Sequence, residues 1–303
     1  MLAIVIPYYR LRFLEETLQS LAAQTDKRFT VYMGDDASPE SPDPVLARFK
    51  DAFDFHYKRF NENLGSVSLV RQWERCMAMT RDERWLMILG DDDTLEPDCV
   101  ASFYARAATI EALNIKVIRF VTRKINASSA PISDLYSHPE IETATDFLIR
   151  KYQHRSRSSL SEYIFDQHTA KTKKFRDFPL AWHSDELAVL EFSGFGNVFT
   201  LGSVVNVRVS EVSISGKKDN LLVKNSASQR FYIVLLGHIK HFSKAQQQLI
   251  FDQAERIYLV NKKAVGYAIK ILSYYLLRLE LGRVFKFLRE IIVTLNHRYA
   301  GRQ

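Results

Sequence analysis

Residues 85–98, WLMILGDDDTLEPD, join a run of apolar residues to a glycine and three consecutive aspartates. Apolar runs of this length are typical of strands that are buried inside a parallel sheet. Three adjacent carboxylates repel one another, and no basic residue within the stretch neutralises them. The pattern leaves three interpretations open: a solvated turn before a helix, a phosphatase nucleophile, or a cation site.

Apolar runs alternate with segments of helical periodicity along the first 124 residues. Strands are expected at 2–6, 29–34, 53–57, 84–89 and 116–121, with helices at 11–23, at 45–49 and from about Ser66. This alternation predicts an α/β fold with a doubly wound, mostly parallel sheet. Later in the chain, a strand is expected at 161–165 and two further strands within 197–210, with helices at 145–152 and 184–192.

Polar residues follow three of these strands. Tyr8 and Tyr9 follow the first strand, Asp35 and Asp36 the second, and the three aspartates the fourth. Ligands of doubly wound sheets bind beyond the carboxyl ends of the strands, so all three clusters are expected to face one crevice. Carboxylates suit Mg²⁺ or Mn²⁺, which proteins hold through one or two such groups together with phosphate oxygens. This placement favours the cation site.

A phosphatase is disfavoured by Gly90. Phosphatases with the pattern D-x-D-x-T need an aspartate nucleophile directly after the strand, and alignment on Asp92-Asp93-Thr94-Leu95 puts Gly90 at that position. Glycine has no nucleophilic side chain. The sequence also lacks a G-x-x-x-x-G-K-[ST] loop and a G-x-G-x-x-G motif after the first strand, which disfavours a P-loop enzyme and a dinucleotide-binding dehydrogenase.

Several segments in their order and spacing resemble the inverting family-2 glycosyltransferases, which have the A-type glycosyltransferase fold. The segments are IVIPYYR (4–10), LEETLQSLAAQT (14–25), MGDDAS (33–38), NENLGSVSLVRQW (61–73) and ILGDDDTLEPD (88–98). The similarity covers roughly the first 210 residues. It implies a catalytic domain over 1–210, with a nucleotide-sugar-binding half at 1–124 and an acceptor-binding half at 125–210.

The resemblance also assigns the donor site. It implies that Tyr9 lies against the nucleotide base and that Asp36 lies at the base's hydrogen-bonding edge. A tyrosine ring stacks well on a base, and a carboxylate accepts a hydrogen bond from a ring N–H. The other residues implied to bind the nucleotide sugar are Pro7, Tyr8, Asp35 and Arg71.

The common metal motif of the family is D-x-D-D-x-L-x-P-D, and here Gly90 stands where the first aspartate often lies. The resemblance then places Asp91 beside the ribose, Asp92 at the metal, and Asp93 as a helper ligand or a helix cap. The expected cofactor is Mn²⁺ or Mg²⁺, acting on the leaving diphosphate.

The general base of the family lies in an acidic pair at the start of a later helix. The segment that matches is FPLAWHSDELAVLEFS (178–193), so the base is Asp185 or Glu186, with Asp185 preferred. Trp182 and His183 are implied to line the acceptor side. The basic stretches 151–157 and 171–176 form either a mobile lid over the diphosphate or simply solvated loops.

The C-terminal region has a different character. Residues 211–225 are expected to be a linker and 226–303 a basic helical region, with helices at 229–242, 244–280 and 282–299. Residues 262–303 hold nine basic side chains against two acidic ones, so the positive charge lies in the tail and no nucleic-acid partner is implied. The tail's apolar positions either contact an anionic membrane or pack on the catalytic domain or a second subunit.

The two cysteines, Cys76 and Cys99, are far apart in the sequence and match no disulfide or zinc-binding spacing. This pattern indicates a reducing compartment. The N-terminus lacks the pattern of a signal peptide, and no window is apolar enough for a membrane span. These features favour a cytoplasmic protein, either free or peripheral at the inner face of the cell membrane.

The sequence thus predicts a metal-dependent inverting glycosyltransferase that uses a nucleotide-diphosphate sugar, most simply a UDP-sugar. The acceptor is a saccharide or lipid-linked hydroxyl, and the resemblance implies surface polysaccharide synthesis in a bacterium. A sugar-phosphate nucleotidyltransferase is the first alternative, but Pro7-Tyr8-Tyr9-Arg10 stands where it needs a glycine-rich loop. A non-catalytic nucleotide-sugar binding protein is the second, and it has no need of an acidic pair at 185–186.

Overall fold

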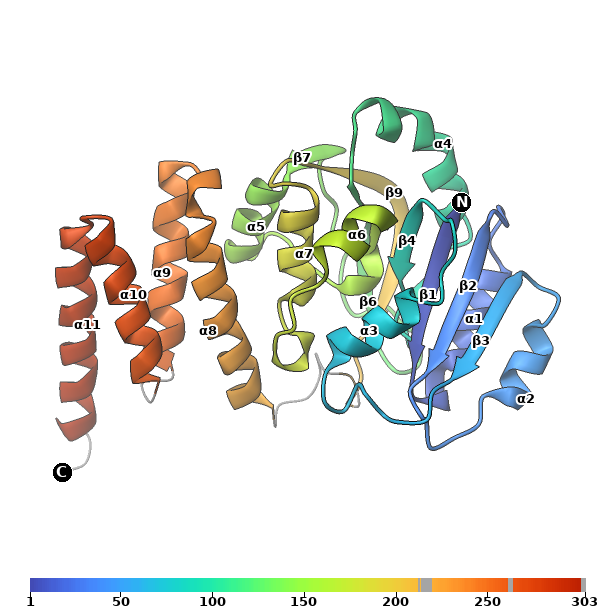
Figure 1. Cartoon of the computed structure of the whole chain (residues 1–303), viewed down its shortest axis with the longest axis horizontal. Coiled ribbons are helices and arrows are strands. Elements are labelled where there is room, and N and C mark those ends of the chain that lie inside the picture. Colours follow the sequence, from blue (N-terminus) through green and yellow to red (C-terminus); the bar gives the residue numbers. More distant parts are fainter. Residues whose placement is uncertain (212, 214–219, 261–263, 301–303) are drawn as a thin grey trace. The chain divides into compact units, whose positions relative to one another are not determined.

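Figure 1 shows the computed structural model of the chain. It describes residues 1–211, 213, 220–260 and 264–300, the last seven of them by their backbone alone. The chain divides into two compact units, 1–219 and 220–303. The expected helix 244–280 and the linker 211–225 each run partly through residues outside this description.

Unit 1 is built on one large mixed sheet with the strand order β3-β2-β1-β4-β8-β6-β9-β5, and β7 pairs with β9. The strands are β1 (Leu2–Tyr8), β2 (Phe29–Asp35), β3 (Asp54–Arg59), β4 (Trp85–Ile88), β5 (Thr94–Leu95), β6 (Val117–Ile125), β7 (Ile141–Thr143), β8 (Tyr163–Asp166) and β9 (Asn197–Arg208). β3, β2, β1 and β4 form a parallel block, and β8 runs antiparallel to both β4 and β6.

Helices cover both faces of this sheet, as expected for a doubly wound fold. They are α1 (Leu14–Ala22), α2 (Asp43–Leu46), α3 (Leu69–Met77), α4 (Cys99–Ala112), α5 (Ala144–Tyr152), α6 (Gln167–Lys173) and α7 (Ser184–Phe192), with short 3₁₀ turns between some of them. Alternate residues of β1 point to opposite faces, and Leu2, Ile4 and Ile6 join the apolar faces of α1 and α4. The opposite face carries α3, α6 and α7 (Figure 1).

An aromatic cluster joins these last elements. Phe175 contacts Trp73 of α3, Phe165 of β8 and Phe192 of α7, with ring centroids 5.1–5.6 Å apart in edge-to-face geometry. Such pairs add specific geometry to the burial of apolar area. The cluster fixes α7, which carries the predicted acidic pair, against the sheet.

The predicted fold class is confirmed, an α/β fold with C-terminal helices, but some predicted elements are wrong. Residues 197–208 form one strand, because the Gly202-Ser203 region bulges opposite Phe120 and Val121 where a turn was expected. α3 begins at Leu69, because the Ser68 hydroxyl accepts a hydrogen bond from the Arg71 amide and caps the helix there. The strand expected at 161–165 corresponds to β8, but its antiparallel direction was not predicted, and neither β5 nor β7 was predicted.

Unit 2 is helical throughout its described residues. It contains α8 (Leu221–Gly237), α9 (Lys244–Val260), α10 (Val265–Leu277) and α11 (Leu281–Ala300), with a 3₁₀ turn at Ile239–His241. Its own core includes Phe231, Leu235, Ile250, Ile271 and Phe287, all fully buried. The single helix expected over 244–280 is wrong, since Ala264, directly before α10, has a non-helical backbone with φ −87° and ψ 59°. Among the described residues, no helix combines the length and apolar content that a bilayer crossing requires.

Candidate active site

The three aspartates lie in a tight turn beyond β4, held mainly by backbone N–H groups. The Asp91 carboxylate accepts hydrogen bonds from the backbone amides of Tyr9 and Arg10, at 2.9 and 3.0 Å. The Asp93 carboxylate accepts one from the Arg208 amide at 2.8 Å. These bonds join the ends of β1, β4 and β9 at one edge of the sheet, as the sequence predicted for β1 and β4.

Burial and mutual repulsion disfavour the charged form of this triplet. Burial raises the pKa of Asp91 and of Asp93, and the pKa of Asp92 is raised well above its usual range by burial and then by the charges of Asp93 and Asp91. A divalent cation beside Asp92 would reverse this shift, because it stabilises the ionised carboxylate.

Gly90 makes the close turn possible. A Cβ atom at this position would lie 3.0 Å from Asp92 Oδ1 and 3.2 Å from Asp93 Oδ2, tighter than ordinary contacts. The Gly90 amide donates to Ser161 Oγ at 3.0 Å. Glycine at position 90, where the resembling motif often has an aspartate, therefore leaves space for the Asp92 and Asp93 carboxylates beside the backbone.

Asp36 is buried and closely bound within the protein. Its carboxylate accepts from the amides of Leu64 and Gly65 at 2.7 and 2.8 Å and pairs with Arg75. A Cβ atom on Gly65 would lie 2.4 Å from Asp36 Oδ2, so glycine is required for this approach. Burial raises the pKa of Asp36, while the hydrogen bonds from Gly65 and Leu64 and the charge of Arg75 act in the opposite direction. Asp36 thus ties β2 to the segment that precedes α3.

Arg75 was missed by sequence reasoning, which singled out Arg71. Arg71 is exposed on α3, whereas Arg75, one turn later, contacts Asp36 and packs over the Phe60 ring at 4.0 Å. The available signal was the i, i+4 spacing of the two arginines, which places both on one side of α3.

The other predicted nucleotide-site residues differ in exposure. Tyr8 is fully buried, its hydroxyl donates to the Glu40 carbonyl at 3.0 Å, and burial raises its pKa to about 12. Asp35 is also fully buried and accepts from Tyr57 and Arg59 at 2.6 and 2.8 Å. Tyr9 and Pro7 are only partly buried, so they are the members of this group with exposed side-chain surface.

The predicted acidic pair lies in the first turn of α7, and its two members have different environments. The Glu186 carboxylate contacts Lys151 and, at 2.9 Å, His183 Nδ1. Burial acts to raise its pKa, but Lys151 and His183 outweigh burial and hold the pKa below its ordinary value. Asp185 accepts from Ser158 Oγ at 2.9 Å, and burial and then Glu186 raise its pKa.

The segment before α7 has an unusual backbone. Leu180, Ala181 and His183 have φ values of +58°, +51° and +73°, in the left-handed region that residues with a Cβ rarely adopt. Such conformations persist only where the surrounding structure imposes them, and they gather at functional sites. Here they carry Trp182 and His183 to the start of α7, with the two rings 5.8 Å apart between centroids.

A short segment, residues 157–163, connects the two acidic clusters. Ser161 contacts Gly90, while Ser158 contacts Asp185 and lies 2.9 Å from the Tyr163 hydroxyl. Its Glu162 side chain is fully buried, and burial raises the Glu162 pKa to about 7. The aspartate triplet and the acidic pair are thus tied to a single segment, although about 90 residues separate them in the sequence.

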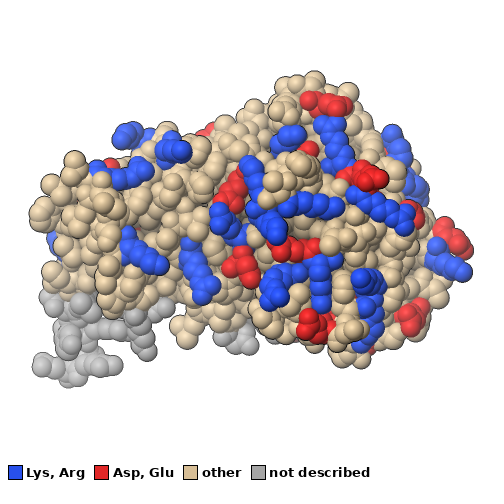
Figure 2. Space-filling view, viewed as in Figure 1, with Lys and Arg blue, Asp and Glu red and all other residues tan. Residues whose placement is uncertain are grey.

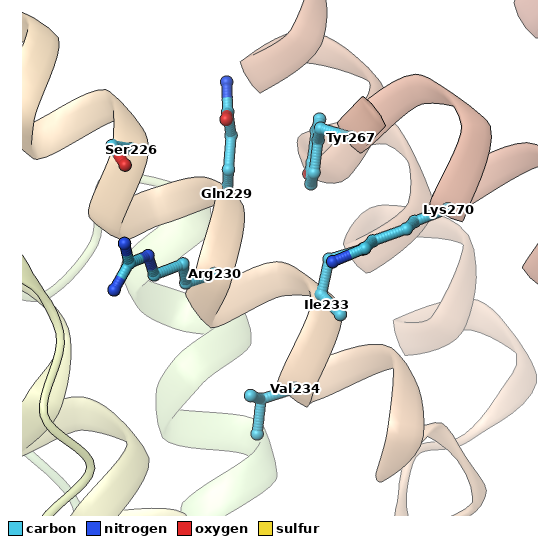
Figure 3. A pocket seen from close by; sticks show the side chains of 7 residues that line it. All are labelled: Ser226, Gln229, Arg230, Ile233, Val234, Tyr267 and Lys270. Carbon is cyan, nitrogen blue, oxygen red and sulfur yellow. The ribbon is translucent and has the colours of Figure 1, made fainter. Parts of the chain in front are cut away.

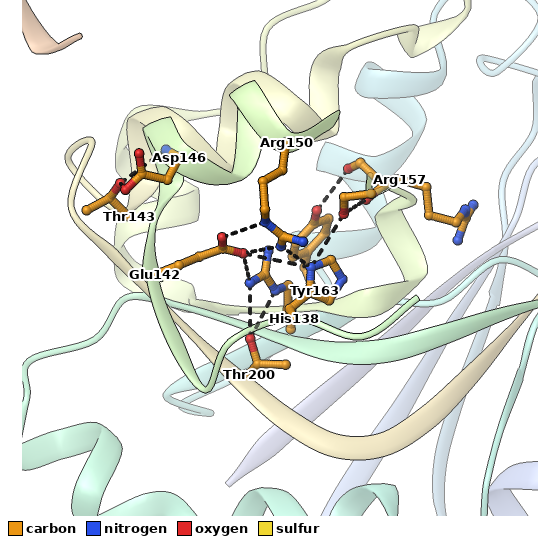
Figure 4. A network of polar contacts seen from close by, with 11 residues as sticks. His138, Glu142, Thr143, Asp146, Arg150, Arg157, Tyr163 and Thr200 are labelled. Atoms are coloured by element: carbon orange, nitrogen blue, oxygen red, sulfur yellow. Dashed lines mark hydrogen bonds and ion pairs between the residues drawn. The ribbon is translucent and has the colours of Figure 1, made fainter. Parts of the chain in front are cut away.

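A buried ionic network lies beside this segment (Figure 4), and its Arg119 interacts electrostatically with Tyr163 and Glu162. Glu142 pairs with Arg119, which is fully buried, and with Arg150 at 2.5 Å, and His138 Nδ1 lies 2.7 Å from Arg150. Burial and then the neighbouring arginines lower the His138 pKa to about 2. One carboxylate therefore compensates two arginines in a largely buried site.

The sequence did not single out Ser158, Ser161, Arg208 or Lys151. The Arg208 guanidinium donates to the Asp92 carbonyl at 2.8 Å and to Glu16 at 2.6 Å, while its amide binds Asp93. Lys151 lies in the basic stretch 151–157, which sequence reasoning treated as a lid or a solvated loop. Serines and single basic residues carry no sequence signal of their own, so their roles emerge only from the fold.

Comparison with known proteins identifies the family of the chain. Residues 3–169, more than half of the chain, match the model of the family "Glycosyl transferase family 2". The chain belongs to this family, as its motifs predicted. No protein of curated function matches the sequence directly.

Solved structures of TarS from S. aureus have a similar fold. The structure of TarS 1–349 in complex with UDP-GlcNAc has a TM-score of 0.65 and 14% identity, over 97% of this chain and 81% of that one. TarS 1–349 in complex with UDP has a TM-score of 0.64 and 13% identity, over 100% and 92%. A longer TarS structure has a TM-score of 0.60 and 16% identity, and the match covers 85% of this chain and 43% of that one. At this identity the similarity shows the A-type glycosyltransferase fold.

Proposed function

We propose that this glycosyltransferase is a metal-dependent inverting enzyme that transfers a hexose from a nucleotide-diphosphate sugar, most simply a UDP-sugar, to an acceptor hydroxyl. The observation that carries the proposal is the connection of the aspartate triplet to the Asp185–Glu186 pair through residues 157–163. A transfer of this kind needs a leaving-group site and a base near each other. The fold similarity to TarS, solved with UDP-GlcNAc, supports the choice of donor.

We assign the donor side to the edge formed by β1, β2 and β4. Tyr9 offers a partly exposed ring for the base, with Pro7 beside it. Asp36, Asp35 and Tyr8 are buried and shape this edge, and exposed Arg71 lies on the same helix as Arg75. Asp91, bound to the amides of Tyr9 and Arg10, is assigned to the ribose side.

We assign Mn²⁺ or Mg²⁺ to Asp92, with Asp93 as a helper. In the described part of the chain, no group of three or more His, Cys, Asp or Glu side chains forms a complete metal site. These cations are commonly held by one or two carboxylates plus phosphate oxygens, and the raised pKa of Asp92 fits a carboxylate that gains from a cation. When bound, the cation would stabilise the charge of the leaving diphosphate.

We assign Asp185 as the general base. A base must change its protonation near the working pH, and the pKa of Asp185 is raised whereas that of Glu186 is lowered. Glu186, bound to Lys151 and His183, would keep its charge and orient the start of α7. Trp182 and His183 would then face the acceptor, a saccharide or a lipid-linked sugar of a surface polysaccharide.

A cytoplasmic location belongs to the same proposal, since both cysteines are buried and unpaired. The decisive experiment measures UDP release from UDP-sugars by the purified chain, with Mn²⁺ and with chelator, in the presence of saccharide acceptors. Acceptor-dependent UDP release that the chelator abolishes would support the proposal. Pyrophosphate-dependent formation of UTP would instead identify a nucleotidyltransferase, and binding without turnover a non-catalytic protein.

A further inference from the structure

The turn between α10 and α11 (Figure 1) carries four leucines in or directly beside it, and all four are exposed to solvent. Leu276, Leu277, Leu279 and Leu281 are 52%, 86%, 81% and 52% exposed. We call these four residues the leucine tip. Apolar side chains so close together on a surface commonly mark a place of interaction.

The backbone of the leucine tip is itself unusual. Leu279 has a φ of +57°, a conformation that glycine or asparagine adopts at the end of a helix at lower cost. The Leu279 amide donates to the Leu276 carbonyl at 3.1 Å, and the Glu280 amide donates to the Tyr275 carbonyl at 2.9 Å, so the turn is well formed. Leucine at position 279 is unfavourable in two respects, because its backbone has a positive φ and its apolar side chain is exposed. We infer that this side chain contacts a binding partner.

Exposed apolar residues continue from the tip along both helices. Val265, Ile269 and Leu276 lie on one side of α10, and Leu281, Phe285, Leu288 and Ile292 follow a helical spacing on α11. The buried residues of the same helices, Ile271, Tyr275 and Phe287, occupy other positions of the helical repeat. Each helix thus has an apolar stripe in addition to the one that builds the core of unit 2.

The charge of unit 2 indicates what covers this surface. Residues 220–303 carry 14 Lys and Arg against four Asp and Glu, a net charge of +10, whereas residues 1–219 carry 28 against 31, a net charge of −3. On the face drawn in Figure 2, unit 2 displays blue and tan surface with little red, while blue and red intermingle over unit 1. Two copies of so basic a surface would repel each other, but an anionic surface would attract it.

Individual cations flank the apolar residues. Lys270, Arg278 and Arg289 directly follow Ile269, Leu277 and Leu288, and none of the three forms an ion pair with a carboxylate of the described residues. By contrast, Arg283 and Lys286 pair with Asp252 at 2.6 and 3.0 Å and so serve the fold of unit 2.

A pocket of about 370 Å³ between α8 and α10 is also lined by basic and apolar side chains (Figure 3). Its lining combines Arg230 and Lys270 with Gln229, Ile233 and Val234, and contains no carboxylate. The buried Gln229 amide nitrogen has no hydrogen-bond partner among the described residues. A pocket with cations, an amide donor and apolar walls suits an anionic head group rather than a second basic protein surface.

We propose that α10, α11 and the leucine tip form a surface that binds an anionic lipid bilayer. The leucines enter the interface between head groups and acyl chains, and the flanking cations contact anionic head groups. The proposal does not depend on the transferase assignment, because it concerns a different unit and can be tested without substrate.

The test is flotation of the full-length chain with vesicles of phosphatidylcholine alone and with vesicles that also contain phosphatidylglycerol. We expect binding to the anionic vesicles only, weakened by high salt. The double variant Leu277→Ser/Leu279→Asn should bind about tenfold more weakly, and its asparagine suits the backbone at 279. Lys270→Gln/Arg289→Gln should lose roughly fivefold per cation removed.

Matched controls lie in unit 1. Leu113→Ser changes a half-exposed leucine, and Lys50→Gln/Lys58→Gln changes two exposed lysines, so both should float like the wild type. Circular dichroism establishes that each variant is folded. The proposal is overturned if the wild type does not bind anionic vesicles, or if the leucine variant binds as well as the wild type. It is also overturned if light scattering finds a dimer that the leucine variant converts to a monomer, since the tip would then join two copies.

Discussion

The two acidic clusters of unit 1 both contain buried carboxylates, but the charges of these carboxylates are compensated to different extents. At the end of β4, Asp91 and Asp93 accept hydrogen bonds from backbone amides, and the pKa values of all three adjacent aspartates stay raised. At the start of α7, Glu186 is compensated by Lys151 and His183, and its pKa is lowered. Glu186 is therefore balanced within the protein, whereas the aspartate triplet would gain from a positive charge brought by a ligand.

The two members of the acidic pair also differ from each other in their partners. Asp185 has a hydroxyl partner, Ser158, and a raised pKa, while its neighbour Glu186 has two cationic partners. One residue is therefore suited to exchange a proton and the other to hold a fixed charge.

The first prediction concerns the division of labour in the acidic pair. Asp185→Asn should lower kcat by roughly 100- to 10,000-fold with little change in KM for the donor, because the general base is lost. Glu186→Gln should lower it by only about tenfold, since it removes a positioning charge. Steady-state kinetics on the same UDP-sugar and acceptor measure both. A larger loss in Glu186→Gln than in Asp185→Asn would transfer the role of base to Glu186.

The second prediction concerns the aspartate triplet. Asp92→Asn should lower transfer by roughly 100- to 1000-fold, because the cation contact at the leaving group is lost. The same change should raise the melting temperature in metal-free buffer, since one of three repelling carboxylates is neutralised. Asp51→Asn, at an exposed position, is the control and should change neither. A drop in melting temperature for Asp92→Asn would contradict the view that the triplet is uncompensated.

The third prediction concerns the buried ionic network around Glu142. Glu142→Gln should lower the free energy of unfolding by about 3–5 kcal/mol, because it leaves Arg119 and Arg150 without a compensating charge. Glu140→Gln, two residues away, breaks an exposed pair with Arg106 and should cost less than about 1 kcal/mol. Urea denaturation measures both, and equal costs would show that the buried network does not stabilise this half of the sheet.

The fourth prediction follows from Glu162, whose pKa is raised to about 7 by burial. Between about pH 4.5 and 7 the folded state keeps a proton that the unfolded state releases, so stability falls as pH rises through this window, by at most about 3 kcal/mol. Glu162→Gln should remove this contribution and gain most in relative stability near pH 8. Denaturation curves of both proteins from pH 5 to pH 8 check the sign, and parallel curves would mean that Glu162 does not titrate in this range.

The sequence predicted the parts of this site that depend on strand order and on motifs. Asp91–Asp93 and Asp36 could be placed at one edge because parallel strands bring their carboxyl ends together. Asp185 and Glu186 were found through the resemblance of their segment to a family motif. The predicted halves of the catalytic domain and the roles of the individual residues stay predictions.

The rest depends on contacts that have no local pattern. Ser158 and Ser161 connect the clusters only because β8 inserts antiparallel between β4 and β6, a direction that apolar runs do not encode. Arg208 reaches the triplet because β9 continues through a bulge where a turn was expected. Such long-range pairings are decided by packing across the sheet, which a sequence pattern does not contain.

We propose above all that the aspartate triplet binds a divalent cation together with a nucleotide diphosphate. Calorimetric titration of the wild type and of Asp92→Asn with UDP, each with Mn²⁺ and with chelator, tests it most directly. We expect tight binding only for the wild type with Mn²⁺, and Asp185→Asn should bind like the wild type because its carboxylate belongs to the other cluster. Equal UDP affinity of wild type and Asp92→Asn, with or without Mn²⁺, would contradict the claim.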